Sequence, residues 1–332
     1  MCLSLILGVQ LSAAPKPPDS AASGFILAVQ EQLFNDRFDS AFTLCELYIN
    51  SQSTSPVGYL FKAGTLLGEM RDREEAHYSQ ELRNLVDTVI ELCDKGLKIG
   101  TGNDTAYYYL WRGHAHVYRS LFESRFGSVT SAIKNGFRAH DDYRAGLDHD
   151  STLYDLYFGL GNYHYWKSVK AGILRTVGIV SNDIEKGITE LHLAADSGLY
   201  FGEAAQNSLI WIYQNEGKYD SAIVLAEPAL TKYPESRTLR WPLAEAYVKS
   251  ERYQEAADIY SYLREYFDDN RGNYFNLIEC DYYLYQCLKK LGRNKEAEEL
   301  LNSVSNYRSQ VPRSAQRRQL AKLNYLRREL AR

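Results

Sequence analysis

The 332-residue chain is poor in the features that mark membrane-spanning, disordered and nucleic-acid-binding proteins. It has no run of about 18 consecutive apolar residues, so the sequence predicts no transmembrane helix. It has only 8 prolines, and Pro, Ser and Gly do not gather into a long linker after residue 24. The formal net charge is −4, and this slightly acidic balance gives no reason to expect nucleic acid as a partner.

Sequence signatures of catalysis and metal binding are missing as well. The five cysteines form no CxxC pair and no Cys/His cluster, which argues against a zinc site. Cys280 and Cys287 lie two helical turns apart, roughly 10 Å, which exceeds the reach of a disulfide. The chain has no GxxxxGK[ST], GxSxG or HExxH motif, and His114 and His116 would point to different faces of a helix. We therefore predict no metal, no cofactor and no catalytic residue, and keep an enzyme only as a residual alternative.

The chain does contain a pattern that recurs after 34 residues. The stretch EGKYDSAIVLAEPALTKYPES covers residues 216–236, and SERYQEAADIYSYLREYFDDN covers residues 250–270. Tyr219 matches Tyr253 in this comparison, and Ala222 matches Ala256. The interval and the pattern of small and aromatic residues resemble the tetratricopeptide repeat (TPR).

The resemblance implies an all-α fold, a right-handed α-solenoid of about six to seven antiparallel helix hairpins with a C-terminal capping helix. Small residues would let the two helices of a hairpin approach closely, and large residues would fill the space between hairpins. The repeat domain is predicted to span residues 22–311, with its clearest units at 203–236, 237–270 and 278–311. The last unit begins 41 residues after the preceding one, instead of 34, so about seven extra residues fall around 271–277.

Further helices are expected from apolar periodicity and capping signals. Their approximate ranges are 57–70, 74–98, 104 onward, 128–147, 152–169 and 184–197. Residues 312–332 are predicted to be a basic capping helix, whose helical part covers about 314–331.

The apolar segment VKAGILRTVGIVSND, residues 169–183, breaks the repeat pattern because a hairpin normally needs only a short turn. Together with its flanks, it resembles the corresponding region of the eukaryotic inclusion-body-clearance family of TPR proteins. The resemblance rests on Gly159 and Gly161, on Ile173-Leu174, on Val177-Gly178-Ile179 and on the helix opening at Glu185, and covers about forty residues. That family is linked to lipid droplets and to turnover of protein inclusions, but these motifs are not catalytic.

The N-terminus reads MCLSLILGVQLSAAPKPPDSAAS. An apolar run from Leu3 to Val9 precedes the small residues Ser12, Ala13 and Ala14, as in a secretory signal with its cleavage site. The run is short, and no Lys or Arg precedes it. We predict that residues 1–21 are a signal peptide and linker and that the protein is exported to the periplasm or cell envelope, with a cytoplasmic location as the alternative.

The TPR resemblance also implies which side chains line the concave face of the solenoid. The exposed concave slots lie at fixed positions of each unit, mostly on its first helix. Carried over by register, the partner-binding slots are Tyr107, His114, Tyr118, Asn162, Tyr165, Trp166, Asn207, Trp211, Gln214, Asn215, Trp241, Glu245, Lys249, Tyr282 and Gln286, with Asp155 and Lys289 in further slots. Rings offer contact area and amides pair with a peptide backbone, so this mixture suits a peptide groove. Alternatively, about half of these rings pack on the next hairpin.

We therefore predict a non-enzymatic scaffold that binds a protein or peptide on its concave face. The alternative is a membrane- or lipid-associated adaptor that uses the apolar 169–183 connector and the basic C-terminal helix. Residues 307–332 carry eight basic side chains and one acidic one, which leaves a net charge of −11 for the rest of the chain. A basic amphipathic helix can contact an anionic membrane, or it can be a cap whose charge offsets an acidic body. The sequence predicts no particular oligomeric state.

Overall fold

The computed structural model describes residues 20–99, 103–171, 181–268 and 272–331. In these ranges the chain forms sixteen α-helices, one short 3-10 helix and no strand. The helices are α1 (Ser20–Phe34), α2 (Phe38–Ser51), α3 (Pro56–Arg73), α4 (Ser79–Ile99), α5 (Asn103–Phe126), α6 (Val129–His149), α7 (Asp155–Lys170), α9 (Ile184–Ser197), α10 (Gly202–Asn215), α11 (Tyr219–Lys232), α12 (Arg237–Lys249), α13 (Tyr253–Asp268), α14 (Tyr274–Lys290), α15 (Asn294–Tyr307), η1 (Arg308–Gln310), α16 (Arg313–Arg318) and α17 (Leu320–Leu330).

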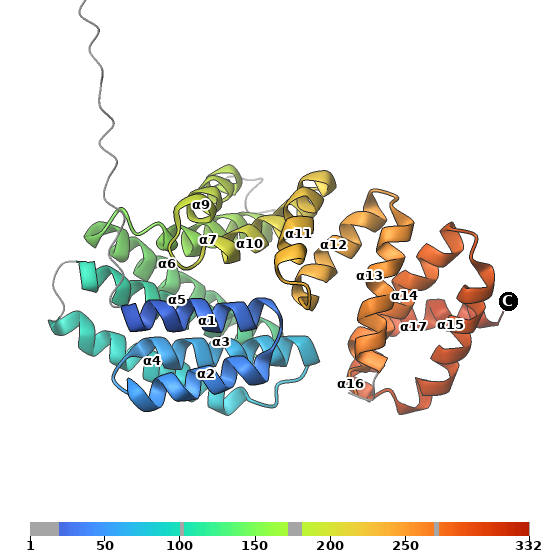
Figure 1. The fold of residues 1–332 in the computed structure, drawn as a ribbon, viewed down its shortest axis with the longest axis horizontal. Coiled ribbons are helices and arrows are strands. Elements are labelled where there is room, and N and C mark those ends of the chain that lie inside the picture. The colour runs from blue at the N-terminus through green and yellow to red at the C-terminus, as the bar shows by residue number, and fades with distance from the viewer. Residues whose placement is uncertain (1–19, 100–102, 172–180, 269–271, 332) are drawn as a thin grey trace, which may run out of the picture.

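Consecutive helices pack as antiparallel hairpins, and the hairpins follow one another along the molecule (Figure 1). The pairs among the described helices are α1/α2, α3/α4, α5/α6, α7/α9, α10/α11, α12/α13 and α14/α15. From α1 to α12, the first helices of neighbouring pairs also contact each other, as stacked repeats require. The all-α solenoid that the sequence predicts is confirmed.

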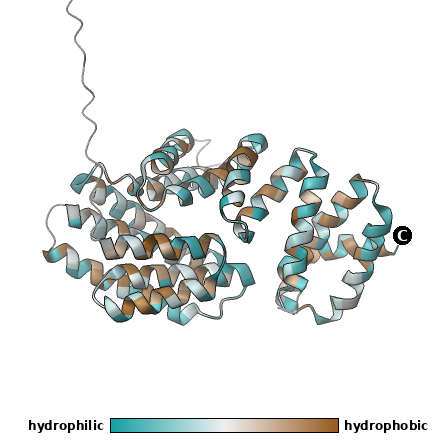
Figure 2. Ribbon diagram, in the orientation of Figure 1, coloured by the Kyte–Doolittle hydropathy of each residue, from teal (hydrophilic) through white to brown (hydrophobic). Residues whose placement is uncertain are grey.

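Small residues set the distance between the helices of a pair. In α7/α9, a Cβ atom added at Gly161 would lie 2.7 Å from the carbonyl oxygen of Gly187, and the reverse distance is also 2.7 Å. In α10/α11 and α12/α13 buried alanines, among them Ala222 and Ala256, allow the same close approach of the two helices. The apolar faces turn inward between the helices, as Figure 2 shows along the array. Cys280 and Cys287 are free thiols in this core, as the spacing predicts.

Two features of the C-terminal part differ from expectation. The first helix of the last unit is long, with 17 residues in α14 against 13 in α12, and α13 of the preceding unit has 16 residues against 14 in α11. The single capping helix expected at about 314–331 is divided into α16 and α17 at Gln319. The buried Gln319 amide donates hydrogen bonds to the Phe275 carbonyl at 3.1 Å and to Glu279 at 2.6 Å, which fixes this break.

No helix in the described ranges is both long and apolar enough to cross a membrane. Residues 1–19 of the predicted signal peptide and residues 172–180 of the apolar connector lie outside the described ranges.

Candidate functional site

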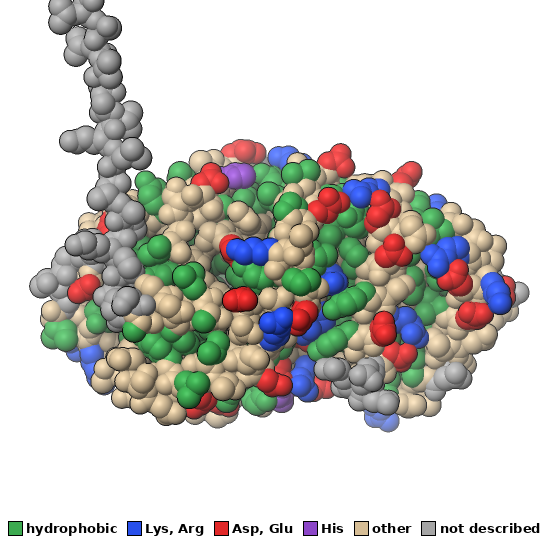
Figure 3. Space-filling view, in the orientation of Figure 1, with side chains coloured by type: hydrophobic (Ala, Val, Ile, Leu, Met, Phe, Trp, Pro, Cys, Tyr) green, Lys and Arg blue, Asp and Glu red, His purple; other side chains and the backbone are tan. Residues whose placement is uncertain are grey.

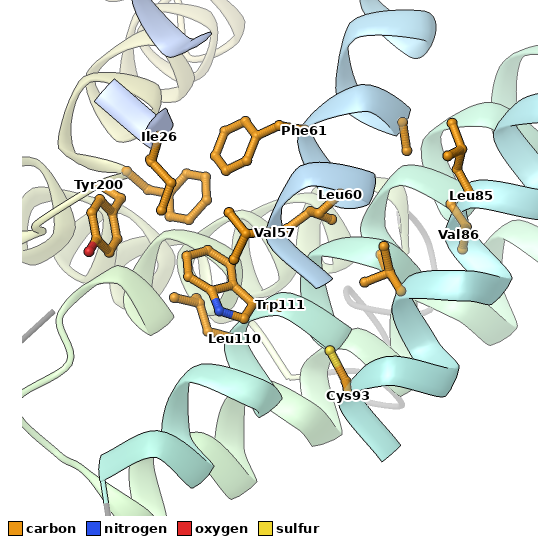
Figure 4. Close-up of a cluster of buried hydrophobic side chains, with 14 of the residues drawn as sticks. Ile26, Val57, Leu60, Phe61, Leu85, Val86, Cys93, Leu110, Trp111 and Tyr200 are labelled. Atoms are coloured by element: carbon orange, nitrogen blue, oxygen red, sulfur yellow. The ribbon is translucent and has the colours of Figure 1, made fainter. Parts of the chain in front are cut away.

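The loop between α9 and α10 fills the face that the first helices of the N-terminal hairpins share. Phe201 stacks on the His114 ring at 4.1 Å between centroids, and Tyr200 lies 6.0 Å from Trp111. Gln30 of α1 donates a hydrogen bond from Nε2 to the Tyr200 carbonyl at 2.8 Å. Figure 4 shows Tyr200 facing the same cluster as Trp111, Ile26 and Val57. The loop 199–201, called the plug below, therefore covers this face of the N-terminal hairpins.

Asp155, at the start of α7, holds the plug in place. Its carboxylate accepts hydrogen bonds from the backbone N–H groups of Leu199 at 3.0 Å, Tyr200 at 2.8 Å and Phe201 at 2.7 Å. Burial raises the pKa of Asp155, although these three amides act in the opposite direction. Satisfying three otherwise orphaned amides is a structural role, because a buried unpaired N–H group is costly.

Four of the predicted partner-binding residues are buried and cannot touch a partner in this conformation. Tyr107 and His114 lie behind the plug. Tyr165 donates a hydrogen bond from its hydroxyl to Glu216 at 2.7 Å and accepts one from Asn215 at 2.7 Å. Gln214 is the fourth. The repeat register correctly placed these residues on the first helices of their hairpins, but it did not predict that the plug covers that face.

Three further residues are half-buried and engaged within the chain. Tyr118 packs so closely on α3 that a Cβ atom at Gly64 would lie 3.0 Å from its hydroxyl oxygen. Trp166 meets the Tyr165 ring edge-on at 5.0 Å, and Asn162 donates a hydrogen bond to a carbonyl of its own helix at 2.9 Å. Their contribution to binding remains a prediction.

The remaining predicted residues lie on the first helices of the last three hairpins: Asn207, Trp211 and Asn215 on α10, Trp241, Glu245 and Lys249 on α12, and Tyr282, Gln286 and Lys289 on α14. Trp241 is half-buried against Phe267, with ring centroids 6.0 Å apart. Tyr282 is half-buried against Tyr325 at 5.3 Å. Trp211 keeps 37% of its surface exposed.

The surface around Trp211 also holds amide groups without hydrogen-bond partners. Asn207 Oδ1 and both amide atoms of Gln214 are buried and form no hydrogen bond among the described residues. Asn207 precedes Trp211 by four residues and Gln214 follows it by three, so all three share one face of α10. We call Asn207, Trp211 and Asn215 the α10 surface, whereas Gln214 is buried. An exposed ring beside side-chain amides suits recognition of a polypeptide backbone.

A second set of buried polar residues joins the N-terminal hairpins to the C-terminal ones. Asp36, in the turn after α1, accepts hydrogen bonds from the N–H groups of Arg237 at 2.6 Å and Thr238 at 3.0 Å, which open α12. Asp72 near the end of α3 forms a two-pronged ion pair with the Arg237 guanidinium, both distances being 3.0 Å. The Asp72 carbonyl accepts a hydrogen bond from Asn276 of α14 at 2.7 Å. We call this network the clasp.

The clasp was not anticipated from the sequence. Asp36 lies in the turn of the first hairpin and Asp72 in the last helical turn of α3, where acidic residues are common on the surface. Only the fold shows that Arg237 meets them. Figure 3 shows acidic and basic side chains side by side along the seam between the two halves of the molecule.

Other buried polar side chains form pairs inside the hairpins. His164 Nδ1 lies 2.6 Å from Glu190 Oε2, which joins α7 to α9. Arg112 of α5 donates hydrogen bonds to Asp142 of α6 at 2.6 and 3.0 Å. In the parts of the chain that the structure describes, no group of three or more His, Cys, Asp or Glu side chains could hold a metal ion. These pairs join helices to one another.

Comparisons with known proteins agree with this architecture. Residues 215–279, from the end of α10 into α14, match the family model of the tetratricopeptide repeat. No curated protein matches the chain. The resemblance of the central residues to the inclusion-body-clearance family is not confirmed.

Among solved structures, the chain is similar to a thermophilic TPR protein of Thermus thermophilus, at 16% identity and a TM-score of 0.42, over 68% of this chain and 99% of that one. It is also similar to the TPR domain of P58(IPK), at 14% identity and a TM-score of 0.21, over 94% of this chain and 89% of that one. The match to the family model and the stacked hairpins lead to one conclusion: this is an all-α helical-repeat protein whose residues 215–279 match the tetratricopeptide repeat.

Proposed function

We propose that this protein is a non-enzymatic interaction scaffold that binds a peptide or protein segment at the α10 surface. One observation carries the proposal: Trp211 keeps 37% of its surface exposed on a face of α10 that also carries the half-buried Asn207 and the exposed Asn215. Tryptophan is enriched at the energetic centres of interfaces, and side-chain amides beside it can pair with a polypeptide backbone.

The plug and the clasp leave a smaller partner-binding surface than the sequence predicts. The plug occupies the face of the N-terminal hairpins, so a partner is left with the first helices α10, α12 and α14. Trp241 and Tyr282 extend that side of the molecule as half-buried rings, and Lys249 and Glu245 add one charge of each sign. A partner segment of mixed polarity fits this surface better than a strongly charged one.

The experiment is a selection of peptides from a random displayed library against the full chain, followed by affinity measurement. Trp211→Ala should weaken binding of the selected peptides by at least about thirtyfold, the usual effect of truncating a central tryptophan. Val224→Ala is the matched control, because Val224 is exposed on the second helix of the same hairpin. Equal affinity of Trp211→Ala and wild type would place the binding surface elsewhere.

The exported location remains part of the proposal. An apolar run followed by small residues supports it, and sequencing the N-terminus of the mature protein tests it. A mature chain beginning near Pro15 would agree with export, whereas an intact Met1 would favour the cytoplasmic alternative.

The alternative lipid-associated adaptor draws less support from the C-terminal helices than their composition suggests. Arg318 is paired with Glu74 at 2.6 Å, and Lys322 with Glu279 at 2.5 Å. Part of the basic charge of α16 and α17 is therefore neutralised inside the molecule. The 172–180 part of the connector lies outside the described ranges.

A further inference from the structure

Helix α6 carries a row of exposed apolar side chains that the fold does not use. Val129, Ile133 and Phe137 keep 69%, 57% and 53% of their surface exposed. Their spacing of four residues places them along one side of the helix. Isolated exposed apolar residues are common, but three in register on one helix form a patch that indicates an interaction site. We call these three residues the α6 stripe.

The opposite face of α6 packs the helix into the solenoid without help from the stripe. Ala132, Ala139 and Tyr143 are buried against α5 and α7, and Ser120 of α5 donates a hydrogen bond to the Ala132 carbonyl at 2.8 Å. Among the described residues, the ring contact of the stripe is that of Phe137 with Tyr163 of α7, at 6.2 Å between centroids. The stripe is therefore available to a partner outside the chain.

Two cations lie beside the stripe. Lys134 and Arg138 directly follow Ile133 and Phe137, which places each about 100° further round the helix. Both side chains are exposed, and no carboxylate of the described residues lies within 4.0 Å of either. The first twelve residues of α6 contain no acidic residue, whereas the chain as a whole has a net charge of −4. Asp141, the next acid along the helix, is exposed, and its carboxylate lies 3.2 Å from Nδ1 of His140.

We propose that the N-terminal half of α6 is a peripheral contact surface for an anionic lipid bilayer. A helix that lies along a membrane places apolar side chains at the boundary of headgroups and acyl chains, and its lysines and arginines at the phosphates. The α6 stripe supplies the first group and Lys134 and Arg138 the second. Such a surface gives weak, reversible and salt-sensitive binding, because only three apolar side chains and two charges take part.

A membrane fits the stripe better than a second protein. The stripe lies exposed on the second helix of its hairpin, and two clefts lined by described residues lie elsewhere, along α13, α14 and α15. Unpaired cations flanking the apolar row match the negative surface potential of anionic lipids.

The test is flotation of the full chain with vesicles of pure phosphatidylcholine and with vesicles of an equal mixture of phosphatidylcholine and phosphatidylserine. The wild type should float with the mixed vesicles at low salt and stay behind with the neutral ones. Lys134→Gln combined with Arg138→Gln should weaken binding about thirtyfold, since each basic residue near an anionic surface contributes about fivefold. Ile133→Asp combined with Phe137→Asp should abolish flotation.

Two control variants make the result specific to α6. Val224→Asp places the same charge at an exposed valine of α11 and should float like the wild type. Arg317→Gln combined with Arg328→Gln removes two exposed cations of α16 and α17 and should also float unchanged. Circular dichroism melts report whether each variant is folded, and the glutamine variant at α6 keeps the test valid if the aspartates unfold the helix.

Three outcomes would overturn the proposal. The first is absence of flotation with the mixed vesicles, which would leave a protein partner as the occupant of the stripe. The second is unchanged flotation of the folded Lys134/Arg138 variant. The third is loss of flotation in the Arg317/Arg328 variant alone, which would assign lipid contact to the C-terminal helices.

Discussion

Three successive repeats place a left-handed backbone position in the turn that follows their first helix. Gly217 and Gly292 take this position, each with φ of 72°. In the repeat between them the residue is Glu251, with φ of 60°. Glycine adopts this conformation without a steric penalty, whereas a side chain with a Cβ atom does not. Glu251 therefore adopts the left-handed conformation that the turn requires, at some cost in stability.

Glu251→Gly should raise the free energy of unfolding by about 0.5–1 kcal/mol, because the strain of the left-handed position exceeds the entropic cost of glycine there. The measurement is the midpoint of thermal unfolding. Gly217→Ala, the reverse change at the equivalent turn, should lower that midpoint. A lower midpoint for Glu251→Gly would show that the Glu251 side chain makes a stabilising contact that outweighs the strain.

His114 makes a different prediction, about pH. Burial behind the plug lowers the pKa of His114 to about 4, and its Nε2 atom is among the buried polar atoms without a hydrogen-bond partner. A histidine whose folded pKa lies below its unfolded value of about 6.5 favours folding only while it is neutral. Its contribution is therefore complete above pH 6.5 and should fall by about 3 kcal/mol as the pH drops towards 4.

Urea unfolding of wild type and His114→Phe between pH 7 and pH 4.5 checks this prediction. Phenylalanine keeps the stacking with Phe201 and cannot be protonated, so the variant should lose less stability than the wild type over this range. His116, whose pKa burial also lowers to about 4, stays in both proteins and gives them a shared pH dependence. Parallel curves would mean that position 114 is not the titrating group.

At the scale of elements, the plug makes the α9–α10 loop part of the core. The paired aromatic residues Tyr200 and Phe201 stand in a short loop between two helices, and this pair is a sequence signal that could have indicated a buried loop. Phe201→Ala should destabilise the protein by about 3–5 kcal/mol, the usual cost of removing a buried phenylalanine. The measurement is urea unfolding. Leu199→Ala serves as the control, since Leu199 in the same loop is exposed and should change stability little.

The helices themselves were largely predictable from sequence, because helical periodicity and caps are local signals. The range 184–197 expected for α9 coincides with Ile184–Ser197. The break at Gln319 was not predictable, because it depends on hydrogen bonds to Phe275 and Glu279, which lie 44 and 40 residues away along the chain. The predicted slots do lie on the first helices of the hairpins. The plug, however, comes from a loop between hairpins, and a repeat pattern carries no information about such a contact.

At the scale of the whole molecule, the clasp ties together parts of the chain that the sequence separates widely. The hydrogen bond from the Arg237 N–H to Asp36 spans 201 residues. Local periodicity describes each hairpin and its neighbour, so it cannot reveal that the first two hairpins meet the last two. Removing the carboxylates that hold a buried arginine strongly destabilises the folded protein.

Asp36→Asn combined with Asp72→Asn should open the clasp and lower the free energy of unfolding by about 3 kcal/mol, because Arg237 is left buried without a counter-charge. Small-angle X-ray scattering should show a larger radius of gyration. Arg37→Ala is the control: it removes the exposed ion pair with Glu235 at the same seam, which should change the free energy of unfolding little. An unchanged radius for the double variant would mean that apolar contacts alone hold the two halves together.

Open solenoids grow or shrink by whole units, since each unit needs only its neighbours. In this protein the clasp opposes such a change in the number of units. Asp36 and Asp72 contact Arg237 only with the present number of hairpins between them. Duplication or deletion of one unit would displace the carboxylates from the arginine and break the contact. Selection on this contact would hold the number of repeats constant, even where individual repeats drift far from the family pattern.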